Sequence, residues 1–184
     1  MRGPLRALGA ITCAATLVSI AGDARAEDEH ELVPLPVARF DVGFLSNPSE
    51  EDAGILGEID VGAHFHYRYA FFGGEIGYAA SQASEPALAQ FFQLGLPIGV
   101  TTEEAFFGIG FTPRLLLGER LNHDITALRL AGTIYALGGS IVVELGHERW
   151  FGDGGGAHIT GFIGVDAGRF LYLIIDDSEL SKLD

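Results

Sequence analysis

Two histidines have the residue type and spacing that could support metal chemistry. His64 and His66 are two residues apart in a segment of strand-like alternation, and Glu58 and Asp60 lie an even number of residues before them. Residues two apart in a strand point to the same face, so the two imidazoles could share a metal ion. The same spacing suits a hydrogen-bonded pair inside a polar barrel, which is the interpretation we favour. We therefore expect no metal or other cofactor.

A larger set of charged residues of both signs shares the polar face of the alternating segments. If that face is enclosed, opposite charges must pair, because an unpaired buried charge is costly. The predicted interior ion pairs involve Arg39, Asp41, Glu58, Asp60, Arg68, Glu75, Arg114, Arg129 and Glu144.

A serine activated by a histidine is the third chemistry to consider, since it would give a lipid hydrolase or acyltransferase. The candidate bases are His147, with Glu144 and Glu148 nearby, and His158. The serines of the chain, such as Ser81 and Ser140, have no predicted proximity to them. No nucleophile and base pair emerges, so we expect no enzymatic activity.

Composition restricts the class of protein. The chain has 184 residues and a formal net charge of -14, which argues against binding nucleic acid because the phosphates would be repelled. It is 48% hydrophobic, too apolar for a disordered acidic chain, and its 26 glycines are many for a helical protein. One domain built from strands and tight turns is the expectation.

The N-terminus has the features of a secretory signal peptide over residues 1–26. Arg2 and Arg6 precede an apolar stretch, and a small-residue pattern ends at Ala26. Cys13 would be lost with this leader, leaving no disulfide. Residues 27–36 are charged and rich in proline, which predicts a flexible N-terminal segment.

Beyond residue 36 the dominant pattern is a period of two, which predicts strands. The eight predicted strands cover 37–46, 57–71, 74–81, 92–100, 106–118, 125–136, 141–148 and 157–175. Pro97 predicts a bulge or break, Pro113 a local irregularity, and Gly168 with Arg169 a bulge in the last strand. Alternating longer and shorter loops, with a tight turn at 71–74, predict a closed up-and-down antiparallel β-barrel at 37–175, followed by a polar tail at 176–184.

The composition of the two faces indicates which one is enclosed. The polar face is rich in glycine, which suits the narrow interior of an eight-stranded barrel better than a water-facing surface. The apolar face is rich in aromatic residues, and the doublets Phe71–Phe72, Phe91–Phe92, Phe106–Phe107 and Trp150–Phe151 lie near predicted turns. Aromatic girdles facing lipid have this character, so the apolar face is predicted to point outward and the strands to span a membrane.

Over residues 37–175 this pattern resembles the small eight-stranded outer-membrane β-barrel proteins of Gram-negative bacteria, the class that contains the transmembrane part of outer membrane protein A. The resemblance implies a monomer in outer-membrane lipid, inserted by the barrel assembly machinery, with a structural or interaction role or minor passage of small solutes but no wide pore. Two alternatives remain: a soluble periplasmic barrel of lipocalin-like shape that binds an apolar ligand, and a lipid-modifying enzyme of the outer membrane.

Overall fold

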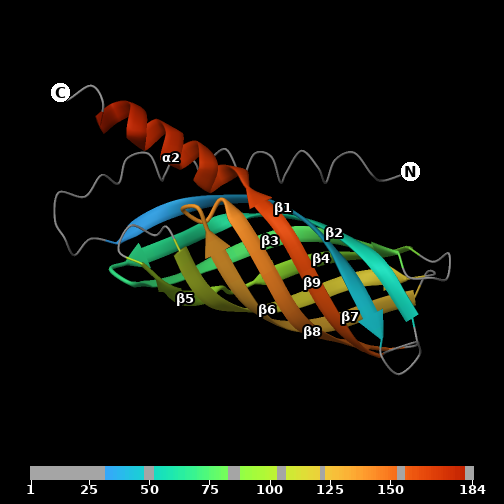
Figure 1. Ribbon diagram of the computed structural model, residues 1–184. Coiled ribbons are helices and arrows are strands. Elements are labelled where there is room, and N and C mark those ends of the chain that lie inside the picture. The colour runs from blue at the N-terminus through green and yellow to red at the C-terminus, as the bar shows by residue number, and fades with distance from the viewer. Residues whose placement is uncertain are drawn as a thin grey trace.

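The described part of the chain forms a closed antiparallel β-barrel followed by a helix (Figure 1). The computed structural model describes residues 32–47, 52–82, 88–102, 107–120, 123–152 and 156–180. The elements are β1 (Val33–Asn47), β2 (Asp52–Tyr67), β3 (Ala70–Gln82), β4 (Leu88–Gly95), β5 (Ile98–Thr101), β6 (Phe107–Arg120), β7 (His123–Ala136), β8 (Ile141–Phe151), β9 (Ala157–Asp166) and α2 (Ala167–Leu180).

The barrel closes because the last strand returns to the first. β1 pairs with β2 along its whole length and with β9 over residues 39–46, and every pairing around the sheet is antiparallel. Closure gives each strand two neighbours. The predicted closed up-and-down barrel of eight strands is confirmed, with one of the eight divided into two pieces.

β4 and β5 are the two pieces of that strand, interrupted at Leu96 and Pro97. Both pair with β3 on one side and β6 on the other, without a change of register. Leu96 N–H donates to the carbonyl of Pro113 on β6 at 3.1 Å, so the two prolines lie at one level of the barrel. The predicted break at Pro97 is confirmed. β6 itself continues through Pro113. Proline has no backbone N–H to donate, and in β6 this position lies opposite the interruption of the neighbouring strand, where that hydrogen bond is not needed.

The two ends of the barrel differ in their connections. At the loop end lie the connections β1–β2, β3–β4, β6–β7 and β8–β9. At the helix end, Arg68 and Tyr69 turn the chain into β3, residues 137–140 turn it into β8, and β9 runs into α2. The tight turn predicted at 71–74 is therefore wrong. Arg68 makes the turn earlier, with a φ of 52° in the left-handed region.

The predicted last strand is also wrong beyond Asp166. β9 ends there, and residues 167–180 form α2, so the alternation change near Gly168 marks a helix start rather than a bulge. The segment RFLYLII is apolar at nearly every position, and a short run of that kind does not distinguish a strand from a helix. Within the described residues, no helix is both long and apolar enough to cross a membrane.

Some sequence predictions concern the chain termini and loops. The predicted signal peptide at 1–26, residues 27–31, Phe106 and the tail at 181–184 lie outside the described residues. Of the segment 27–36 predicted as flexible, residues 33–36 are part of β1. Residues 176–180, predicted as tail, belong to α2.

The burial pattern confirms the predicted orientation of the two faces. Arg39, Arg114 and Arg129 are buried inside, whereas large apolar side chains such as Val42 and Leu145, each 63% exposed, point outward. One part of the prediction is wrong: the aromatic doublets do not lie wholly outside. Because neighbours in a strand point to opposite faces, one member of each described doublet points inward. The inward members are Phe71, Phe91 and Trp150, and the outward members are Phe72, Phe92 and Phe151.

The β7–β8 turn depends on a glycine at position 139. Gly139 has a φ of +82°, and a Cβ added there would lie 2.6 Å from Cδ of Arg169. We expect Gly139→Ala to lower the free energy of unfolding by about 1–3 kcal/mol, because backbone strain and a side-chain clash coincide. Urea unfolding of the purified protein measures the change. Gly74→Ala is the control, since a Cβ there meets nothing within 4 Å, and an equal loss in both variants would contradict this account.

Candidate functional site

The middle of the lumen is filled by a network of buried charges centred on Arg39. Its guanidinium donates to Asp41 at 2.6 Å and to Asp60 at 2.8 Å, and its Nη2 lies 3.4 Å from Glu75. All four side chains are at most 3% exposed. The alternation of β1, β2 and β3 brings them together, because each points to the inner face of its strand.

Arg114 and Arg129 extend the network across the barrel. Arg114 on β6 pairs with Glu144 on β8, and its Nη2 lies 3.2 Å from Glu75. Arg129 on β7 pairs with Glu58 and, at 2.6 Å, with Glu148. The ion pairs therefore connect opposite walls of the lumen, which leaves little room for a water-filled path.

Gln93 joins the carboxylates that lie between the arginines. Its amide nitrogen donates to Asp60 at 2.6 Å and lies 3.4 Å from Glu58. Oxygens of Asp41, Glu58 and Asp60 lie within 4.8 Å of one another, a spacing that could hold a cation. Arg39 and Arg129 already supply positive charge to these three groups, so the cluster alone does not indicate a metal site.

Eight of the nine residues predicted as interior ion pairs meet in this network, and the exception is Arg68. Arg68 lies in the exposed turn at the helix end, where its guanidinium is 5.8 Å from the ring centre of Tyr67. The prediction for Arg68 is wrong because the second strand ends one residue before it.

Glycines on the inner face make space for the large charged side chains. A Cβ at Gly164 would lie 2.7 Å from Cγ of Asp41, and one at Gly77 would lie 3.0 Å from Cγ of Asp60. A side chain at either position would displace a carboxylate from its arginine. This explains the alternation of glycine and charge that is visible in the sequence.

At the helix end, Arg169 of α2 enters the lumen and contacts the two predicted metal-binding histidines. Its Nη2 donates to Nδ1 of His64 and lies 3.4 Å from Nε2 of His66. Because arginine only donates, His64 accepts through Nδ1, and its Nε2 donates to Glu75 at 2.9 Å. The histidines do share one face, as predicted, and a guanidinium engages both rings. The structure therefore gives no support to metal binding there.

Arg169 is a functional candidate that the sequence interpretation missed. It is 2% exposed, pairs with Asp166 at 3.6 Å and lies over the ring of Tyr135 at 5.1 Å. Glu148 and Asp166 are two further members of the buried network that were not predicted. Glu148 is an even number of residues from Glu144 on β8 and points to the same inner face, so the alternation of the sequence is sufficient to predict it. Arg169 can be placed in the lumen only when the start of α2 is known.

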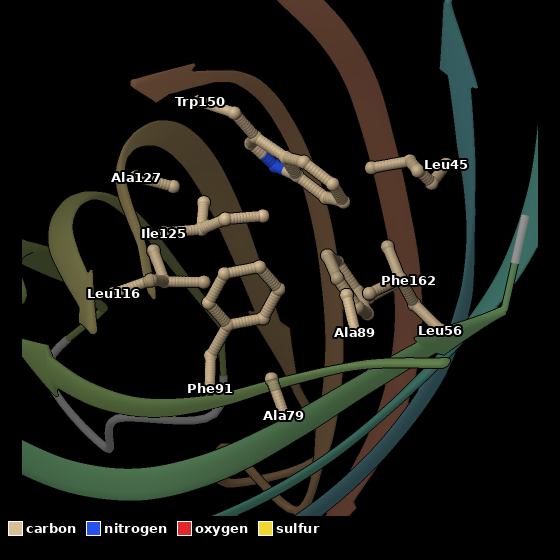
Figure 2. Packing of buried hydrophobic residues seen from close by; sticks show 10 residues of the cluster. All are labelled: Leu45, Leu56, Ala79, Ala89, Phe91, Leu116, Ile125, Ala127, Trp150 and Phe162. Atoms are coloured by element: carbon tan, nitrogen blue, oxygen red, sulfur yellow. The ribbon is translucent and has the colours of Figure 1, made fainter. Parts of the chain in front are cut away.

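The loop end of the lumen is closed by apolar side chains rather than ions. Figure 2 shows the side chains of this cluster converging inside the barrel. Its members are Leu45, Leu56, Ala79, Ala89, Phe91, Leu116, Ile125, Ala127, Trp150 and Phe162. Phe91 and Trp150 pack edge to face with ring centres 5.3 Å apart, and Trp150 Nε1 donates to Glu148. The cluster forms an apolar layer between the charged network and the loops.

The serine and histidine candidates are not brought together. Ser140 lies in the turn at the helix end, and its hydroxyl has no hydrogen-bond partner among the residues that the structure describes. His147 points to the outer surface, and His158 packs on Trp150 near the loop end at 4.6 Å between ring centres. Ser81 is buried near the loop end of β3.

Comparisons with protein-family models, with curated proteins and with solved structures found no match to this chain. Its function therefore has to be inferred from the two surfaces described above, the sealed lumen and the apolar exterior.

Proposed function

We propose that this protein is a small β-barrel of a bacterial outer membrane, exported by an N-terminal signal peptide and inserted as a monomer by the barrel assembly machinery. Its role is structural or interaction-based, with a lumen too full for a wide pore. The observation that carries the proposal is the apolar character of the outer surface around the whole barrel.

Charge is nearly absent from that outer surface. Among the outward-facing strand residues that the structure describes, the charged ones are Glu119, Asp124 and Arg149, and His147 is the one histidine. All four lie in the half of their strand nearer the loop end. A water-soluble barrel would carry charges along its whole outer face, because surfaces of soluble proteins avoid large apolar patches. These four residues lie on the adjacent strands β6, β7 and β8, and charge confined to one end of the strands is typical of a surface that leaves lipid there.

The apolar rows have the length needed to cross a bilayer. On β6 the outward row runs from Phe107 to Leu117 before the charge at Glu119. At about 3.3 Å per residue and a tilt near 40°, that row covers roughly 25 Å, the height of the apolar band of membrane barrels. Outward aromatic residues border the band near the helix end, where Tyr67, Tyr69 and Phe72 are exposed.

Cell fractionation combined with a heat-dependent gel shift tests the membrane assignment. We expect the protein in the outer-membrane fraction, and we expect unheated samples in SDS to migrate differently from boiled ones, because the closed sheet resists the detergent. Recovery from the periplasm without detergent, with the same migration before and after boiling, would contradict the proposal.

The filled lumen predicts little solute passage. Liposomes that contain the protein should swell in arabinose or sucrose no faster than empty liposomes, because the ion network and the apolar cluster together occupy the interior. A general porin serves as the positive control. Swelling at a rate comparable to the porin would show that the lumen opens.

A soluble lipocalin-like barrel accounts less well for these surfaces. Such a barrel needs an apolar cavity for its ligand and a polar exterior. Here the apolar interior residues pack against one another, as Phe91 does on Trp150, and ion pairs fill the middle of the lumen. The lipid-modifying alternative gains no support from the positions of Ser81, Ser140, His147 and His158.

A further inference from the structure

The barrel wall has a gap at the helix end that none of the described strands fills. β9 stops pairing with β1 at Arg39↔Asp166, while β1 continues to Val33 and stays paired with β2 on its other side. On the side toward β9, residues 33–38 of β1 therefore have no strand neighbour within the described part of the chain. A gap of this kind would expose backbone polar groups to lipid, which is strongly unfavourable.

The first turn of α2 fills this gap. The N–H of Ala38 donates to the Asp166 side chain at 3.0 Å, so the residue before α2 replaces a missing strand partner. Gly168 approaches β1 so closely that a Cβ would lie 2.8 Å from the Pro36 carbonyl oxygen. Pro36 is buried, although outward residues further along β1, such as Phe40, are about half exposed. Figure 1 shows α2 leaving the tip of β9 close to β1 and then pointing away from the barrel, and α2 contacts β1.

Arg169 fixes the rotation of this helix. Its side chain enters the lumen and reaches Asp166, His64 and the ring of Tyr135. Because one helical face is held inward by these contacts, the face opposite must point away from the barrel.

The outward face of α2 is apolar and continues the outer surface of β9. Ile163 and Val165 of β9 are 63% and 55% exposed, and Phe170, Leu171 and Ile174 of α2 are 53%, 57% and 51% exposed. Residues 170, 171 and 174 lie on one side of a helix. The next acidic residues in the sequence are Asp176, Asp177 and Glu179, in the second half of α2.

We propose that the face of α2 formed by Phe170, Leu171 and Ile174 is a lipid-binding surface that completes the membrane-facing wall of the barrel. The inference rests on the proposed membrane function. Its occupant is the acyl-chain region of the bilayer, near the interface on the helix-end side. The argument for lipid, rather than a second copy of the chain, is the unbroken apolar row from β9 into α2.

Fluorescence quenching by brominated lipids tests the proposal in the full chain. Leu171→Trp reports on α2, and Ile163→Trp reports on the barrel wall. The parent chain gives the baseline, because its single tryptophan, Trp150, is 4% exposed and lies inside. In phosphatidylcholine vesicles with brominated acyl chains, we expect the added tryptophan of both variants to be quenched. Bromines near the headgroups should quench Leu171→Trp more than Ile163→Trp, and bromines near the bilayer centre should do the reverse.

The two variants separate failure of this inference from failure of the proposed function. Quenching of Ile163→Trp without quenching of Leu171→Trp would overturn the lipid-binding role of α2 and leave the membrane barrel intact. A Leu171→Trp emission that is blue-shifted, unquenched and sensitive to dilution of the protein in the bilayer would instead assign this face to a second copy. Absence of quenching in both variants would overturn the membrane assignment and the inference with it.

Discussion

Replacing Arg39 with leucine is expected to lower the free energy of unfolding by about 3–5 kcal/mol, among the largest effects of any single substitution in this chain. Arg39 is the shared partner of Asp41, Asp60 and Glu75, all of which are buried. Leucine removes the positive charge and leaves three carboxylates in a closed lumen without their common partner. Urea titration of the protein folded in vesicles, followed by tryptophan fluorescence, measures the change.

Two further variants show whether charge is the cause. Arg68→Leu removes an arginine from the exposed turn and should change stability by no more than about 1 kcal/mol. Adding Asp41→Asn and Asp60→Asn to Arg39→Leu should recover part of the loss, because neutral amides no longer need the guanidinium. An Arg39→Leu protein as stable as the parent, or a triple variant less stable than Arg39→Leu, would contradict the role assigned to the network.

A lysine in the middle of the apolar exterior is expected to destabilise the membrane-folded barrel by about 2–4 kcal/mol. Phe111 on β6 is outward-facing near the middle of the row from Phe107 to Leu117, and its strand neighbours are Ile98 and Gly132. In the proposed membrane, Phe111→Lys would place an ammonium group among acyl chains, with no carboxylate of the described strands beside it on the outer face. Unfolding in vesicles by urea measures the loss.

Glu119→Lys is the matched control for that variant, since Glu119 lies on the same outward row of β6 but at the loop end. Near the interface the cost of a charge falls to about 0–1 kcal/mol. Similar small effects of both lysines would mean that the outer surface of β6 faces water. The comparison therefore tests the membrane assignment independently of cell fractionation.

The barrel could be predicted from the sequence because its alternation is long and regular. Along β2, the outward row through Ile59 and the inward row through Asp60 and His64 follow directly from the period of two. The glycines opposite the charged residues indicated which face is enclosed, and the structure confirms this at Gly77 and Gly164. Pairings such as Arg129 with Glu58 could not be predicted, because they join side chains across the lumen rather than along one strand.

The errors have two physical causes. Alternation continues through a short turn, so the sequence pattern misplaces the boundary between β2 and β3 and predicts that Arg68 lies in the lumen. An almost uniformly apolar segment carries no period, so the pattern predicts a strand where α2 forms and does not identify Arg169 as a lumen residue. Both errors lie at the helix end, where the chain departs from regular pairing.

The short pairing between β1 and β9 has a consequence for the order of folding. The Ala38–Asp166 contact joins residues 128 positions apart, so it costs more chain entropy than any hairpin between consecutive strands. During synthesis β1 emerges long before its second neighbour exists. Until β9 has been made, the unpaired edge of β1 can form hydrogen bonds with other chains. A newly made molecule therefore has to be kept from aggregating until the remaining strands have been synthesised.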